Sequence, residues 1–122
     1  MRPLPLLCAL LGLLCAGCGA APPQRSLARE RGEELYASWN CGACHGEARQ
    51  GTEFGPPLTE LARVWDLPAL TAHLAGPERA RTADPRVRAL ATRFPAPMPA
   101  YPEKEGDRRE LAAWLLAGKA AS

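Results

Sequence analysis

The sequence predicts an all-α fold of about four to five short helices. Prolines number 13 and glycines 11 among the 122 residues, a content that favours short helices joined by stiff loops. Several stretches place apolar residues at helical spacing, and none alternates apolar and polar residues as a half-buried strand does. The length allows one domain with one small core.

The first predicted helix begins at Ser26, a residue type that caps helices, and ends near Ser38. Its apolar set is Leu27, Leu35, Tyr36 and Trp39. Two short helices follow Pro56-Pro57. The first carries Leu58, Leu61, Val64 and Trp65, and the second carries Leu67, Leu70 and Leu74 between Asp66 and Gly76-Pro77.

The last two predicted helices have clear start signals. Asp84-Pro85 places a cap residue before a proline at the first helical position, and the helix ends at Pro95. Its apolar residues are Val87, Leu90, Ala91 and Phe94. Asp107 followed by Glu110 resembles a capping box, after which Leu111, Trp114 and Leu115 form an apolar stripe that Gly118 ends.

Residues 1–17 have the layout of a bacterial export signal. Arg2 precedes a leucine-rich uncharged run that ends in small residues. The sequence Cys15-Ala16-Gly17-Cys18 resembles a lipobox, although Cys15 stands where leucine is usual, so we expect Cys18 to become the lipidated first residue. Cleavage after Ala20 or Ala21 and an uncleaved helical anchor are the alternatives.

We therefore expect a tether over residues 18–25 and a domain over residues 26–122. All three interpretations of the leader place this domain outside the cytoplasm, because Arg2 stays inside. With a lipid anchor it lies on the periplasmic side of the cell membrane, and with a cleaved leader it is soluble in the periplasm. The net charge of +2 gives no basis for nucleic-acid binding.

The cysteines of the predicted domain form one motif. Cys8 and Cys15 fall in the leader, which leaves Cys41 and Cys44 in Cys41-Gly42-Ala43-Cys44-His45. This pattern is typical of c-type haem attachment, in which two thiols add to the haem vinyl groups and the adjacent imidazole binds the iron. A disulfide or thioredoxin-like redox pair is one alternative and a zinc site is another, but His73 is the only other histidine.

Met98 is the candidate for the second axial ligand. It is the only methionine after Met1 and lies between Pro97 and Pro99, in a loop that can hold a thioether at a fixed position. The alternatives are a methionine that fills a gap in the core and ligation by His73, which we expect to be a partly buried structural histidine.

These features together resemble a class I monohaem cytochrome c over roughly residues 28–117. Beyond the haem motif and Met98-Pro99, the matching positions are Gly32, Tyr36, Gly55-Pro56-Pro57-Leu58, Trp114 and Leu115. The resemblance implies helices wrapped around one covalent haem c. It also implies that the Pro56 carbonyl accepts a hydrogen bond from His45, that Leu58 packs on the haem, and that the first and last helices cross.

The resemblance implies an electron carrier rather than an enzyme, with His45 and Met98 as axial ligands. A haem subunit of a larger oxidoreductase complex and a haem enzyme or gas sensor are the alternatives. We expect a monomer whose partners are redox proteins or membrane respiratory complexes. Five arginines, Arg79, Arg81, Arg86, Arg88 and Arg93, favour either a solvated helix face or a docking patch for an acidic partner.

Overall fold

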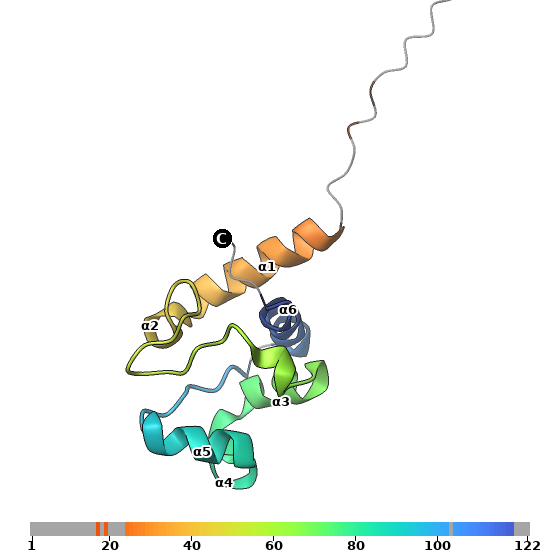
Figure 1. Cartoon of the computed structure of the whole chain (residues 1–122). Coiled ribbons are helices and arrows are strands. Elements are labelled where there is room, and N and C mark those ends of the chain that lie inside the picture. Colours follow the sequence, from red (N-terminus) through yellow and green to blue (C-terminus); the bar gives the residue numbers. More distant parts are fainter. Residues whose placement is uncertain (1–16, 18, 20–23, 103, 119–122) are drawn as a thin grey trace, which may run out of the picture.

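The structure, a computed structural model, describes residues 17, 19, 24–102 and 104–118 and contains helices but no strand among them (Figure 1). The α-helices are α1 (Gln24–Ser38), α2 (Gly42–His45), α3 (Leu67–Ala75), α4 (Pro77–Ala83), α5 (Pro85–Arg93) and α6 (Glu105–Leu116), with one 3-10 turn, η1 (Leu61–Arg63). The predicted all-α class is thus confirmed. The predicted signal segment, apart from Gly17, and Cys18 lie outside the described residues.

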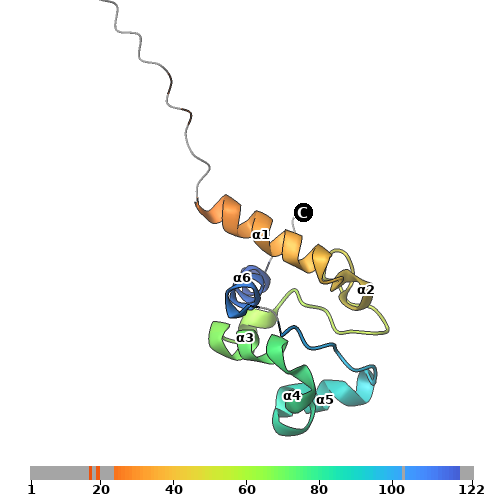
Figure 2. The same ribbon diagram turned by 180° about the vertical axis from the view of Figure 1, so that it is seen from behind.

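The helices at the two ends of the domain, α1 and α6, pack across one another, as Figure 2 shows from behind. The crossing is close because Gly32 of α1 is buried against Trp114 of α6, where any side-chain carbon would overlap the indole. One turn further along α1, the Tyr36 ring lies 5.4 Å from the Trp114 ring. Glycine is therefore required at position 32 by the approach of the partner helix.

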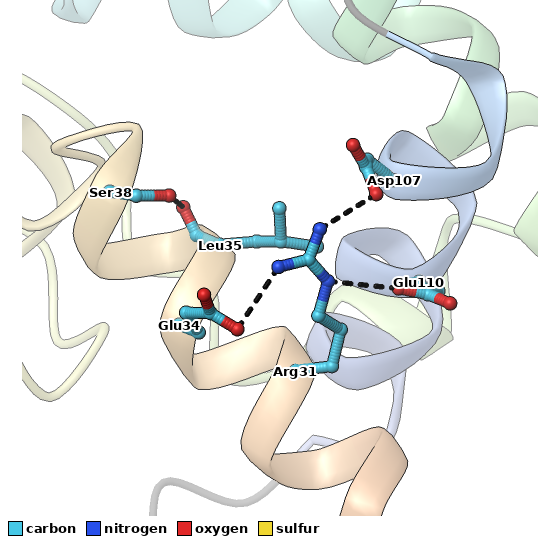
Figure 3. Close-up of polar contacts among 6 residues, drawn as sticks. All are labelled: Arg31, Glu34, Leu35, Ser38, Asp107 and Glu110. Atoms are coloured by element: carbon cyan, nitrogen blue, oxygen red, sulfur yellow. Dashed lines mark hydrogen bonds and ion pairs between the residues drawn. The ribbon is translucent and has the colours of Figure 1, made fainter.

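A charged network borders the same crossing (Figure 3). The Arg31 guanidinium of α1 pairs with Asp107 at 2.9 Å and with Glu110 at 3.3 Å, both on α6, and with Glu34 of its own helix at 3.0 Å. The hydrogen bonds that Arg31 donates to Asp107 and Glu34 raise its pKa, so the guanidinium keeps its charge at any ordinary pH. One cation thus joins two helices through their acidic residues.

The core lies where α3 and α6 meet the end of α1. Leu111 and Ala112 of α6 have no exposed surface, and Leu70 and Leu74 of α3 pack beside them. The other core members are Leu35, Tyr36, Cys41 and Leu115. Cys41 is therefore part of the core, which ties the attachment motif to the packing of the helices.

Helices α4 and α5 pack on each other at the other end of the domain, next to α3 (Figure 1). Asp84 caps α5 by accepting a hydrogen bond from the backbone amide of Arg86 at 2.9 Å. The helix that the Asp84-Pro85 signal predicts is confirmed as α5. No helix among the described residues is long and apolar enough to cross a membrane.

Three features differ from the prediction for physical reasons. The helix expected from Leu58 is only the turn η1, and Leu58 instead belongs to the loop, where its amide is bound to the Arg49 carbonyl at 2.9 Å. Helix α6 begins at Glu105 rather than after Asp107, whose carboxylate pairs with Arg31 instead of capping. Helix α4 was not predicted, since its Pro77 was interpreted as a stop although proline also suits a first helical position.

The close crossing can be tested with Gly32→Ala. The added carbon would overlap Trp114 and force the helices apart, so we expect the free energy of unfolding to fall by about 2 kcal/mol or more. Denaturant unfolding of the haem-loaded protein measures it. Gly106→Ala in α6 is the control, because a carbon there meets nothing within 4 Å. Equal midpoints for the two variants would contradict this account of the crossing.

Candidate functional site

The attachment motif follows α1 without a loop. Asn40 adopts a left-handed conformation with φ of 54°, which asparagine tolerates better than most residues, and turns the chain into α2. The Cys41 amide donates to the Tyr36 carbonyl at 3.0 Å across this turn. Cys41 is buried and Cys44 is exposed, and neither forms a disulfide. Burial raises the pKa of the Cys41 thiol to about 11.

His45 ends α2 with its ring buried. Its Nδ1 lies 2.8 Å from the Pro56 carbonyl oxygen. A carbonyl can only accept, so Nδ1 carries the proton and Nε2 has a free lone pair. Burial lowers the pKa of His45, against the opposing effect of the Pro56 bond, so the imidazole is neutral near neutral pH. A neutral, oriented imidazole is the form that binds a metal.

The loop that carries Pro56 folds back onto α2. The Gly51 amide donates to the His45 carbonyl at 2.7 Å, and the Tyr36 hydroxyl donates to the Gly46 carbonyl at 2.8 Å. Gly55 packs directly against the His45 ring, where a side-chain carbon would lie 3.1 Å from Nδ1. The loop therefore holds the Pro56 carbonyl and the imidazole in a fixed relation.

Arg49 supports this loop from the core side. Its side chain is almost fully buried, and its guanidinium carbon lies 4.2 Å from the centre of the Trp114 ring. Its backbone is left-handed, with φ of 60°, and its carbonyl accepts the Leu58 amide. Burial lowers the pKa of Arg49. An arginine guanidinium nevertheless stays protonated in proteins. The cation–π contact thus connects the loop to the crossing of α1 and α6.

A cavity of about 780 Å³ brings the predicted site residues together. Cys41, Cys44 and His45 line it, and so do Pro56 and Leu58 of the loop. Met98, half-buried and packed on the core, lines it as well. The volume lies in the range of small-molecule and cofactor sites. An imidazole nitrogen and a thioether sulfur suit the iron of a c-type haem, and two thiols stand beside them, so the residues present fit that group.

His73 lies in the wall of this cavity, half-buried on α3. Its ring contacts Trp65 at 4.9 Å, and the Arg86 guanidinium covers Trp65 at 4.0 Å. The Nδ1 atom of His73 is buried without a hydrogen-bond partner, and burial lowers the pKa of the ring. The same three side chains border a second hollow of about 720 Å³ between α3, α4 and α5.

The described residues offer little to a zinc site, since no group of three or more His, Cys, Asp or Glu side chains is placed to hold a metal ion among them. Four of the five arginines between residues 79 and 93 are engaged within the chain, Arg81 among them. Arg86 pairs with Asp84, Arg88 donates to the Thr82 carbonyl, and Arg93 lies over Phe94. Whether they also dock a partner stays a prediction.

Three residues near the site were not assigned a structural role from the sequence. Arg49 has no sequence signal, because nothing in its neighbours predicts burial of a cation. The Tyr101 ring stacks on the Trp39 ring, with the ring centres 4.8 Å apart and an interplanar angle of 9°. The only sequence signal for this contact is that Tyr101 is an aromatic residue shortly after Met98. Arg81 counted only as one charge among five, although it donates to two carbonyls of that loop.

The comparisons with known proteins give one match. The family model described as Cytochrome c matches residues 29–119. No curated protein and no solved structure is significantly similar to the chain. The match runs from within α1 to beyond α6 and includes every residue that lines the cavity.

The contact between the loop and the imidazole can be tested with Gly55→Ala. The added carbon would lie 3.0 Å from the Cys44 carbonyl oxygen and 3.1 Å from the His45 ring, so the ring must shift and its bond to Pro56 weakens. A weaker bond makes the imidazole less basic, and we expect the reduction potential of a bound haem to rise by roughly 20–40 mV.

Redox titration measures this shift, and Gly76→Ala, where a side-chain carbon meets nothing within 4 Å, is the control. A potential for Gly55→Ala equal to that of the control would show that the imidazole tolerates the contact.

Proposed function

Because the chain belongs to the cytochrome c family, we propose that it carries one electron through a haem c bound covalently by Cys41 and Cys44, with His45 and Met98 as axial ligands. The observation that carries the proposal is the cavity, which all four of these residues line. When bound, the haem supplies one-electron redox chemistry at its iron.

The residues around the site have separate parts in this proposal. Pro56 orients His45 and keeps its proton on Nδ1. Leu58 closes the cavity beside the core and excludes water. Met98 would supply the second ligand to the iron of a bound haem, which would favour the reduced state and leave no open site for a substrate. A filled axial position suits a carrier rather than an enzyme.

The cellular setting is part of the proposal. We infer that Cys18 is lipidated and that the residues between Cys18 and α1, which begins at Gln24 rather than at the expected Ser26, tether the domain to the periplasmic side of the cell membrane, as the lipobox-like sequence indicates. There the protein exchanges electrons as a monomer with redox proteins or membrane respiratory complexes. A lipid anchor restricts the carrier to the membrane surface, where such complexes lie.

The axial ligation is tested by optical spectroscopy of the protein made with a c-type maturation system. We expect a low-spin ferric spectrum with the near-infrared sulfur-to-iron band and no carbon monoxide binding by the ferrous form. Met98→Ala should abolish the band and admit carbon monoxide, because it vacates one axial position.

His73→Ala is the matched control, since His73 is the other candidate ligand on the cavity wall. It should leave the band and the carbon monoxide response unchanged. Loss of low-spin character in His73→Ala but not in Met98→Ala would assign the ligand to His73. Carbon monoxide binding by the unaltered protein would contradict the carrier function.

The anchor is tested with Cys18→Ala. The unaltered protein should partition into the detergent-rich phase of a Triton X-114 extraction, with a lipid-modified Cys18 at its N-terminus by mass spectrometry. The variant should lose that modification, because only the cysteine thiol can accept the lipid. An unaltered protein that is recovered in the aqueous phase and begins near residue 21 or 22 would favour a cleaved soluble form.

A further inference from the structure

The segment that carries Met98 has almost no backbone support of its own. Residues 94–101, here termed the Met98 strap, contain Pro95, Pro97 and Pro99, which have no amide hydrogen to donate. In the described part of the chain, backbone–backbone hydrogen bonds reach the strap only at Phe94 and Tyr101, its two ends. The position of Met98 therefore depends on what holds the strap from outside.

The Tyr101 end is firmly anchored. Its amide donates to the Leu74 carbonyl of α3 at 2.9 Å, and its ring stacks on Trp39 at the end of α1. Its hydroxyl also donates to the Trp39 carbonyl at 3.3 Å, and its own carbonyl accepts from Arg108 of α6 at 3.2 Å. Three helices thus fix this end by packing and by backbone bonds.

Between the buried Phe94 and Met98, the strap receives hydrogen bonds from one side chain. Arg81 of α4 donates from Nη2 to the Pro95 carbonyl at 3.3 Å and from Nη1 to the Ala96 carbonyl at 3.4 Å. Glu78, one turn earlier, lies 3.6 Å from Nε and orients the guanidinium from its remaining edge. The Arg81 side chain is 24% exposed, so it lies mostly between α4 and the strap.

We propose that Arg81 is a positioning residue for Met98. Its two bonds shorten the length of strap without external hydrogen bonds from residues 95–100 to residues 97–100. Met98 then has fewer conformations in which its sulfur lies away from the cavity. Arginine suits this task because its planar fork reaches two neighbouring carbonyls at once, which a lysine ammonium does not.

The lengths of the two Arg81 hydrogen bonds indicate how much their loss should loosen Met98. The distances of 3.3 and 3.4 Å exceed the usual 2.7–3.2 Å of N–H···O hydrogen bonds, although the donor is charged. The Arg81 contact is thus weaker than the anchor at Tyr101. Its loss should loosen Met98 without releasing the whole strap. The inference rests on the proposed role of Met98 as an axial ligand.

The test compares Arg81→Gln with Arg79→Gln in the haem-loaded ferric protein. Arg79 is an exposed arginine on the same helix, so both variants lose the same charge from α4. Imidazole is titrated until it displaces the sulfur-to-iron band. We expect Arg81→Gln to bind imidazole roughly threefold to tenfold more tightly than the unaltered protein, because its internal ligand competes less well. Arg79→Gln should bind it unchanged.

A second variant and an unfolding measurement make the test decisive. Arg81→Lys should give an intermediate affinity, and this variant carries the test if Arg81→Gln fails to take up haem. Denaturant unfolding shows whether Arg81 only stabilises the fold and does not position Met98. A lower midpoint with unchanged imidazole affinity would overturn the proposal, and so would an affinity of Arg81→Lys equal to that of the unaltered protein. If the unaltered protein lacks the sulfur-to-iron band, the assignment of Met98 as ligand has failed.

Discussion

The close contact between Gly32 and Trp114 is the constraint on which the rest of the structure depends. Only a residue without a side chain lets α1 and α6 approach so closely, and the indole thereby becomes a shared wall. Arg49 lies against that indole from the loop, and its carbonyl holds Leu58, two residues after the Pro56 that orients His45. The buried Arg49 thus links the packing of α1 and α6 to the position of the His45 imidazole.

Much of the fold could be predicted because local chemistry decides it. Asp84-Pro85 starts a helix through a cap and a fixed φ, and the structure uses both. Prediction failed where a distant partner competes for the same group. The Asp107 carboxylate pairs with Arg31 instead of capping α6, and Leu58 is held in the loop by the carbonyl of Arg49. Neither competitor is visible in the local sequence.

In the site, too, some residues could be predicted from the sequence and others could not. The haem motif and Met98 between two prolines identify candidate ligands, because covalent attachment and axial ligation require particular residue types at particular spacings. The residues that hold those ligands in place do so mostly through backbone carbonyls, which every residue has. The acceptors at Pro95 and Ala96 therefore left no signal in composition or spacing. The Pro56 acceptor was indicated only through the family resemblance of the segment around it, and the structure places it 2.8 Å from His45 Nδ1.

Helices α4 and α5 have almost no apolar interior of their own. No residue of α5 is buried, and Pro77 is the only buried residue of α4. Helices of seven and nine residues are too short to persist in water by themselves. Val87, Leu90 and Ala91 instead face the cavity. This pair of helices therefore depends for its burial on whatever occupies that space, and we expect an occupied cavity to stabilise this half of the domain more than the rest.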